Sequence, residues 1–211
     1  MTPIEWYFDF VSPFAYLQLE VLARRAPTIE LTPVPIVLGA ILSARGQLGP
    51  AEIPAKRRFT YRFVQWQAAR EGIALRFPPT HPFNPIRALR LAIVAGGGVD
   101  AVRLIFRHLW RDGRSLDDPG DWSALSAAVG VEDTTARISN PEVKNALRQN
   151  GERALAAGVF GVPTIAIDGQ LFWGADATAM ALDFLRDPTI FSSGEYARLD
   201  GLPIGAARER P

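Results

Sequence analysis

Strand patterns occur only near the two ends of this chain, and a long segment without one separates them. Residues 4–10 are aromatic and apolar, and residues 29–37 contain alternating apolar side chains, both typical of strands. Residues 163–173 carry Asp168-Gly169 between two apolar runs, a strong signal for a β-hairpin. Strands so far apart in sequence can complete one sheet only if the segment between them is an insertion.

A helix is predicted between the first two strands. Ser12 followed by Pro13 is a typical helix start with Ser12 as the N-cap, and apolar residues then recur at helical spacing to about Arg25. A strand, a helix and a second strand in this order predict a right-handed βαβ unit with parallel strands.

The segment between the ends shows only helical patterns. Residues 55–71 place Phe59, Phe63 and Trp66 about one turn apart, which predicts an amphipathic helix that ends at Gly72. We expect Trp66 to be a core residue. Further helices are predicted over residues 86–95, 99–110, 121–129, 132–138 and 141–157.

Together these patterns predict an α/β fold, in which a four-stranded domain is interrupted by an all-helical domain. A last helix, residues 176–185, is expected to cover the hairpin. Residues 189–211 contain Gly, Pro and Arg without a period and are expected to form an extended tail.

The composition excludes several classes of function. The chain contains no cysteine, which removes disulfides, thiolate metal sites and cysteine nucleophiles, and its two histidines, His81 and His108, are too few for a histidine-rich metal site. A net charge of +1 leaves no basic footprint for nucleic acid. No apolar run approaches the length of a membrane span, and Glu5 and Asp9 stand where a signal peptide would carry basic residues. We therefore expect a cytoplasmic protein without a metal, a nucleic-acid partner or a membrane.

Four segments of the sequence resemble one family. They are Tyr7-Phe-Asp-Phe-Val-Ser-Pro-Phe-Ala-Tyr16, Pro54-Ala-Lys-Arg-Arg58, Gly158-Val-Phe-Gly-Val-Pro-Thr164 and Phe172-Trp-Gly-Ala-Asp176. In this order they resemble the thioredoxin-fold, DsbA-like branch that contains kappa-class glutathione transferases and 2-hydroxychromene-2-carboxylate isomerases. The resemblance implies a discontinuous thioredoxin-like domain, residues 1–53 and 141–187, an inserted helical domain, residues 54–140, and a tail, residues 188–211.

Ser12 has two interpretations. On local pattern alone it is a helix cap. The resemblance implies that its hydroxyl faces the thiol of bound glutathione, at the position where redox members of the fold carry a nucleophilic cysteine. Unpaired N–H groups and the positive end of the helix dipole suit an anion at this point. Ser12 is therefore the predicted catalytic residue, and capping can coexist with that role.

The resemblance also implies contacts to glutathione. A cis Val162-Pro163 bond would turn the Val162 backbone toward the cleft, where the peptide would pair with it like an added strand; a plain loop before a strand is the alternative. Asp176 would bind the γ-glutamyl end, or serve as a charge in the first turn of the last helix. Lys56 matches a family position that meets glutathione, or is a solvated helix lysine.

Two positions depart from the family pattern. Relatives commonly carry Asn in the loop before Pro-Ala, where this chain offers Gln47 as the candidate contact to glutathione. Relatives also tend to carry Arg after the acidic residue, whereas this chain has Ala177, which removes a partner for Asp176 or for a carboxylate ligand.

His81 and Asn84 are the candidate substrate-binding residues. They lie in a Pro-rich loop, residues 77–85, which we expect to overhang the cleft between the domains. The alternative is that both residues shape tight turns before proline. His108 is expected to be structural.

The resemblance implies a glutathione-dependent isomerase of the 2-hydroxychromene-2-carboxylate type, in which glutathione supplies the thiol that the protein lacks. A kappa-like glutathione transferase or peroxidase is the first alternative. The second is a non-catalytic thioredoxin-fold protein that binds a thiol or a peptide. The expected partners are glutathione, a small-molecule substrate and, in a homodimer, a second copy of the chain.

Overall fold

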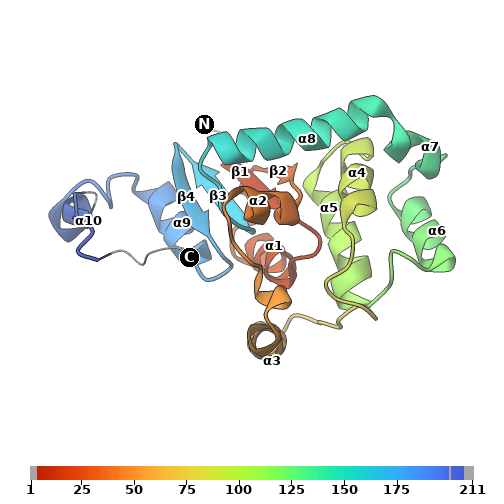
Figure 1. Cartoon of the computed structure of the whole chain (residues 1–211), viewed down its shortest axis with the longest axis horizontal. Coiled ribbons are helices and arrows are strands. Elements are labelled where there is room, and N and C mark those ends of the chain that lie inside the picture. The colour runs from red at the N-terminus through yellow and green to blue at the C-terminus, as the bar shows by residue number, and fades with distance from the viewer. Residues whose placement is uncertain (1–3, 200, 207–211) are drawn as a thin grey trace.

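A computed structural model describes residues 4–199 and 201–206, and strands from both ends of the chain share one sheet in it (Figure 1). The strands β1 (Ile4–Phe8), β2 (Leu31–Pro35), β3 (Thr164–Ile167) and β4 (Gln170–Trp173) lie in the order β2-β1-β3-β4. Residues 54–140 are all described and contain no strand. The predicted α/β architecture with a helical insertion is confirmed.

The amino-terminal βαβ unit forms as predicted. β1 and β2 are parallel, with Ile4 opposite Leu31 and Phe8 opposite Pro35. Helix α1 (Pro13–Arg25) connects them, and Ser12 is its N-cap. The fixed φ of a proline at the first helical position suits this start.

The carboxyl-terminal hairpin completes the sheet. β3 is antiparallel to both β1 and β4. Asp168 and Gly169 connect the two hairpin strands with φ values of 49° and 79°. Two consecutive positive φ values are typical of a type I′ turn, which explains the Asp-Gly pair.

Helices cover both faces of the sheet. The side chains of β1 alternate between the two faces, so this strand contributes to a core on each side. Trp6 and Phe8 belong to the main core, with residues of α1, α5 (Val99–Phe106) and α9 (Thr178–Arg186). Tyr7 belongs to a smaller core on the other face, with residues of α2 (Leu38–Ala44) and α8 (Pro141–Ala156). Helix α2 has no counterpart among the predicted helices.

The inserted block is helical. In Figure 1, α4 to α7 lie to one side of the sheet, and the long helix α8 runs from this block back over the sheet. The elements of the block and the turn before it are η1 (Pro50–Glu52, a 3-10 turn), α3 (Pro54–Glu71), α4 (Ile86–Val94), α5, η2 (Arg107–Arg111, a π-helical turn), α6 (Pro119–Ala128) and α7 (Thr134–Ser139).

Helix α3 differs from the prediction in the face that it buries. It ends at Gly72, which has a φ of 62°, as predicted. Its buried residues are Val64 and Ala68, whereas Phe59 and Trp66 are 67% and 52% exposed. The placement of Trp66 in the core was therefore wrong. The spacing of the aromatic residues identified a helix, but the face that packs against the main core carries Val64 and Ala68.

The tail also differs from the prediction. Residues 194–199 form a short helix, α10 (Gly194–Leu199), in place of an extended segment. Before it, Ile190 and Phe191 pack against the main core, and the ring centroid of Phe191 lies 5.5 Å from that of Phe184. Residues 200 and 207–211 of the predicted tail lie outside the described residues.

Candidate functional site

Ser12 lies at the start of α1 with a polar environment that suits an anion. Its side-chain oxygen accepts a hydrogen bond from the N–H of Ala15 at 3.3 Å, so the hydroxyl hydrogen is left to donate. Pro13 has no N–H, and the N–H of Phe14 has no partner in the part of the chain that the structure describes. The predicted cap is confirmed, and the free donors at this helix start are compatible with a bound thiolate.

Hydrogen bonds from within the turn and from the helical block hold the four-residue turn that ends in Ser12. Within the turn, the N–H of Ser12 donates to the carbonyl of Asp9 at 3.0 Å, and the N–H of Val11 donates to the Asp9 carboxylate at 3.0 Å. From the helical block, Trp110 Nε1 donates to the carbonyl of Phe10 at 2.8 Å. The inserted helices therefore help to place Ser12, the residue for which the family resemblance implies a catalytic role.

His81 reinforces the same turn. Its Nε2 lies 2.8 Å from the carbonyl oxygen of Val11, and its Nδ1 lies 2.7 Å from the hydroxyl of Tyr61. A carbonyl can only accept, so Nε2 carries the hydrogen. The Tyr61 hydroxyl also lies 2.8 Å from the carbonyl oxygen of His81, so it contacts both the ring and the backbone of this residue. Burial lowers the pKa of His81, although the bond to Val11 opposes the shift. Both ring nitrogens thus contact groups of the protein, which makes His81 a support for the turn, and its role in substrate binding stays a prediction.

Asn84 also has a local role. Its side-chain oxygen accepts a hydrogen bond from the N–H of Ile86 at 3.0 Å, two residues later, at the start of α4. This matches the turn-shaping alternative for Asn84. Its exposed side chain keeps its amide group free to contact a ligand, so its role in substrate binding stays a prediction.

The Val162-Pro163 loop lies beside the Ser12 turn, because β1 and β3 pair up to Tyr7 and Thr164. Continuing that register by one residue places Pro163 opposite Phe8. The Val162-Pro163 bond is cis, as predicted. The Val162 side chain is buried in the smaller core, while its backbone makes no hydrogen bond within the described residues. This backbone is available to an extended ligand.

Asp176 is placed by a buried polar network. Gln18 of α1 accepts a hydrogen bond from Trp6 Nε1 at 2.8 Å and donates to the carbonyl of Gly174 at 2.9 Å. The N–H of Gly174 in turn donates to the carbonyl of Pro163 at 2.8 Å. Gly174 has a φ of 94°, and a Cβ there would collide with the Asp176 carboxylate, which explains the glycine of the Gly-x-Asp motif.

Asp176 opens into a groove of about 460 Å³ between α1, α3 and α9. Trp66 and Asp183 also line this groove, whereas Ser12 and Val162 do not. The sheet register places Pro163 opposite Phe8, at the end of β1 that leads into the Ser12 turn, and the N–H of Gly174, two residues before Asp176, donates to the carbonyl of Pro163.

Gln47 and Lys56 lie farther along the chain on separate elements. Gln47 follows α2, where its N–H donates to the carbonyl of Leu42 at 2.9 Å. Lys56 lies in the first turn of α3. Both side chains are exposed, and neither has a hydrogen bond or ion pair within the described residues. Their contacts to glutathione stay predictions.

Three residues that build the site were missed by the sequence reasoning: Asp9, Gln18 and Trp110. Asp9 is the one that carried a signal, since an acid inside an aromatic strand segment is unexpected unless it has backbone partners. Gln18 and Trp110 read as ordinary helix residues, and only the fold shows that they reach Gly174 and Phe10.

Asp9 is buried and has an unusual ionisation. Burial raises the pKa of its carboxyl from 3.8 to about 7, although the N–H groups of Leu38, Val11 and Phe10 oppose the shift. Between these two values the unfolded chain loses the proton and the folded chain keeps it. Ionisation of the unfolded chain then favours unfolding as the pH rises.

We expect this group to make the free energy of unfolding fall between pH 4 and pH 7, by up to about 1.4 kcal/mol per pH unit. Denaturant titrations of the wild type and of Asp9→Asn over this range isolate the effect, because the variant lacks the ionisation. Parallel pH profiles for the two proteins would contradict the assignment.

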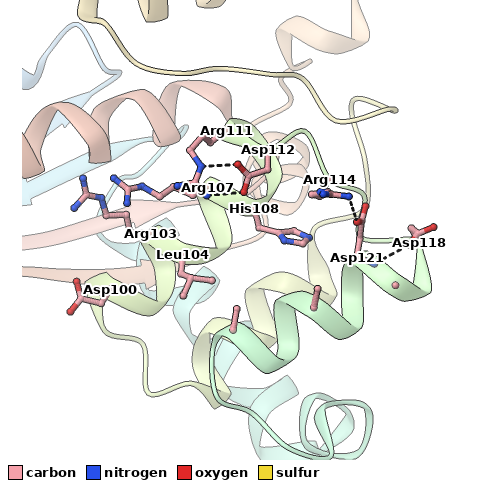
Figure 2. A pocket seen from close by; sticks show the side chains of 13 residues that line it. Asp100, Arg103, Leu104, Arg107, His108, Arg111, Asp112, Arg114, Asp118 and Asp121 are labelled. Carbon is pink, nitrogen blue, oxygen red and sulfur yellow. Dashed lines mark hydrogen bonds and ion pairs between the residues drawn. The ribbon is translucent and has the colours of Figure 1, made fainter.

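A larger cleft, of about 880 Å³, lies between α5, η2 and α6 (Figure 2). It is rich in arginine, but its guanidinium groups pair with carboxylates: Arg111 with Asp112, and Arg114 with Asp121. Figure 2 shows His108 directed toward Arg114 and Asp121. With its charges already paired, this cleft is a poorer anion site than the start of α1.

The described residues contain no helix long and apolar enough to cross a bilayer. They also contain no group of three or more His, Cys, Asp or Glu side chains arranged to hold a metal ion.

A four-stranded sheet with a helical insertion, a capped helix start and a neighbouring cis-proline define a thioredoxin-like protein with serine at the helix start. The chain belongs to the family of the DSBA-like thioredoxin domain, whose model matches residues 3–186. The family inferred from the four motif segments is thereby confirmed.

Within this family, the chain is similar to proteins of two kinds. A 2-hydroxychromene-2-carboxylate isomerase of Sphingobium xenophagum is 30% identical over 192 residues, covering 87% of this chain and 95% of the relative. A glutathione S-transferase kappa 1 of Homo sapiens is 24% identical over 207 residues, covering 87% and 91%. A solved 2-hydroxychromene-2-carboxylate isomerase structure matches with a TM-score of 0.74 at 25% identity, covering 90% of this chain and 99% of that one. The relatives are thus isomerases and glutathione transferases.

Proposed function

We propose that this protein is a glutathione-dependent isomerase of the 2-hydroxychromene-2-carboxylate type. The observation that carries the proposal is the serine hydroxyl at the start of α1, with the unpaired Val162 backbone just before β3, the strand that pairs with β1, in a chain without cysteine. Such a site can hold and stabilise a thiolate that another molecule brings. The isomerases among the similar proteins support the same reaction.

The donors and acceptors of the site fit glutathione. The unpaired N–H and carbonyl of Val162 suit the peptide part, which would lie along them as an extra strand. The exposed Asp176 carboxylate suits the ammonium of the γ-glutamyl end, and Lys56 and Gln47 are the candidates for the remaining polar groups. The Ser12 hydroxyl and the free N–H of Phe14 suit the thiolate.

Glutathione held at this site would supply a thiolate that can add reversibly to the β-carbon of a conjugated enone, so that the former double bond could rotate as a single bond before the thiolate leaves. Ser12 contributes by donating its hydroxyl hydrogen to the sulfur without being consumed. The dipole of α1 adds a positive field at the same point. The pKa of a free thiol is about 8.5, so this stabilisation decides how much thiolate exists near pH 7.

The reaction is tested by following a cis-enone substrate and free thiol in the same assay. An isomerase requires glutathione but does not consume it, and S-methylglutathione does not replace it. Loss of thiol in step with product would instead favour the kappa-like transferase or peroxidase, which the kappa-class relatives support. Titration calorimetry that shows glutathione binding without turnover would favour the non-catalytic thiol-binding protein.

Asp176→Asn is expected to weaken glutathione binding about tenfold, since the ammonium loses its charged partner. Asp183→Asn is the matched control, because Asp183 lines the same groove on α9 but is paired with Arg186. Titration calorimetry with both variants measures the effect. Equal affinities for the two variants would remove Asp176 from the glutathione site.

We also propose that the protein is cytoplasmic and forms a homodimer. The absence of cysteine is compatible with a reducing compartment. Sedimentation equilibrium measures the oligomeric state, and cell fractionation with an antibody measures the location. A monomer at micromolar concentration, or the protein outside the cytoplasmic fraction, would contradict the respective statement.

A further inference from the structure

Asp9 is a buried acid that the proposed reaction does not use. Its side chain is fully buried, and it forms no ion pair within the described residues. One carboxylate oxygen accepts from the N–H of Val11 at 3.0 Å, and the other accepts from the N–H of Leu38 at 2.8 Å. The carboxylate therefore bridges two segments that are far apart in the sequence.

The two bridged segments both matter for the site. Val11 lies in the turn that ends in Ser12, and the Asp9 carbonyl holds the N–H of Ser12 in the same turn. Leu38 is the first residue of α2, a helix with no side-chain cap and no acidic residue in its first turn. Asp9 thus supplies to α2 the acceptor that α2 lacks, and fixes its start against the Ser12 turn.

We propose that Asp9 is a positioning residue for Ser12, whose carboxylate holds the Ser12 turn and the start of α2 in one arrangement. Its consequence for catalysis rests on the proposed function, whereas its consequence for the two segments does not. An ionised carboxylate accepts at both oxygens. A protonated one turns one oxygen into a donor, which weakens the bridge on that side.

The surrounding titratable groups are engaged elsewhere. Tyr7 of β1 donates its hydroxyl to Glu5, and Arg45 after α2 donates to the carbonyl of Leu155. His81 contacts the turn through the carbonyl of Val11, and burial lowers its pKa. The ionisation of Asp9, with a pKa near 7, is therefore the one that directly changes this bridge.

A buried charge that lowers stability at neutral pH is retained by proteins mainly at functional sites. Asp9→Asn tests the proposal, because the amide keeps the shape of the acid but offers one acceptor for two N–H donors. Asp121→Asn is the matched control. Asp121 likewise accepts a backbone N–H, that of Ser115 at 2.9 Å, but it lies in the helical block.

The first measurement is amide hydrogen exchange by NMR at pH 8. In Asp9→Asn we expect exchange at Val11 and Leu38 to be about tenfold faster than in the wild type, and unchanged in Asp121→Asn. In the wild type, the resonances of these two amides should titrate together with the Asp9 carboxyl carbon, a result that needs no variant. Unchanged protection of both amides in Asp9→Asn, or two amides that do not follow Asp9, would overturn the proposal.

The second measurement is the pKa of the glutathione thiol in the complex, from thiolate absorbance. Loss of positioning is expected to raise this pKa by about one unit in Asp9→Asn, with a lower kcat and little change in KM. Loss of a nearby negative charge alone would lower it, so a downward shift would overturn the proposal. If the wild type does not bind glutathione, the proposed function fails, and the exchange measurement alone decides the role of Asp9.

Discussion

Ser12→Ala is expected to lower the proposed isomerase activity near neutral pH about 10- to 100-fold while the protein stays folded. The thiolate of bound glutathione would lose a charge-assisted hydrogen bond of roughly 1.5–3 kcal/mol, which raises the pKa of the thiol by about one to two units. Below that pKa less thiolate is present, so activity falls. As the pH rises through the new pKa, activity should partly return.

Ser12→Ala also removes the N-cap of α1, and the resulting loss of stability must be separated from the loss of thiolate stabilisation. Removing a capping side chain costs about 0.5–2 kcal/mol of stability. Asp118→Ala removes the cap of α6, where Asp118 accepts from the N–H of Asp121 at 2.8 Å, and it provides the control. The pH profiles of turnover and the thermal midpoints of both variants should be measured together. A Ser12→Ala enzyme with the wild-type pH profile would remove Ser12 from the mechanism.

Of the substitutions proposed for this protein, Glu20→Gln is expected to lower the free energy of unfolding most, because the Glu20 carboxylate joins α1 to α5 and η2. Its carboxylate accepts from Arg103 at 2.8 and 3.1 Å and from Arg107 at 2.7 and 3.0 Å. Breaking a buried ion pair costs about 3–5 kcal/mol. The Arg103 and Arg107 side chains are 28% and 36% exposed, so water takes over part of their interaction. We therefore expect the low end of that range, about 3 kcal/mol.

The pKa of Glu20 determines in which direction its contribution to stability changes with pH. Burial alone would raise the pKa of the Glu20 carboxyl, but Arg103 and Arg107 outweigh it and lower the pKa from 4.5 to about 2. The stability from this carboxylate is therefore present above pH 4.5 and is lost as the pH falls toward 2.

Denaturant titrations at pH 7 and pH 3 measure the difference between the wild type and Glu20→Gln, which should shrink at the lower pH. Glu152→Gln is the control, because Glu152 pairs with Arg148 on the surface and its loss should cost less than about 1 kcal/mol. Equal losses for the two variants would show that the Glu20 cluster does not stabilise the fold.

Local patterns predicted the elements that depend on local physical chemistry. Ser12-Pro13 marked the start of α1, and Asp168-Gly169 marked the hairpin, because capping and positive φ values are properties of a few adjacent residues. The motif segments identified the family and the cis Val162-Pro163 bond. No strong periodic signal marked the seven-residue helix α2, whose first N–H is capped by Asp9 from another segment.

By itself, the sequence determined that strands from both ends of the chain share one sheet around a helical insertion, that Ser12 caps a helix, and that the chain has no thiol of its own; the cis-proline came from the family resemblance. Only the tertiary structure decided that Trp66 faces outward and that His81 supports the Ser12 turn. It also decided that Asp9 bridges that turn to α2. The physical reason is that caps and turns arise from neighbouring residues, whereas burial and buried hydrogen bonds depend on which distant segments pack together.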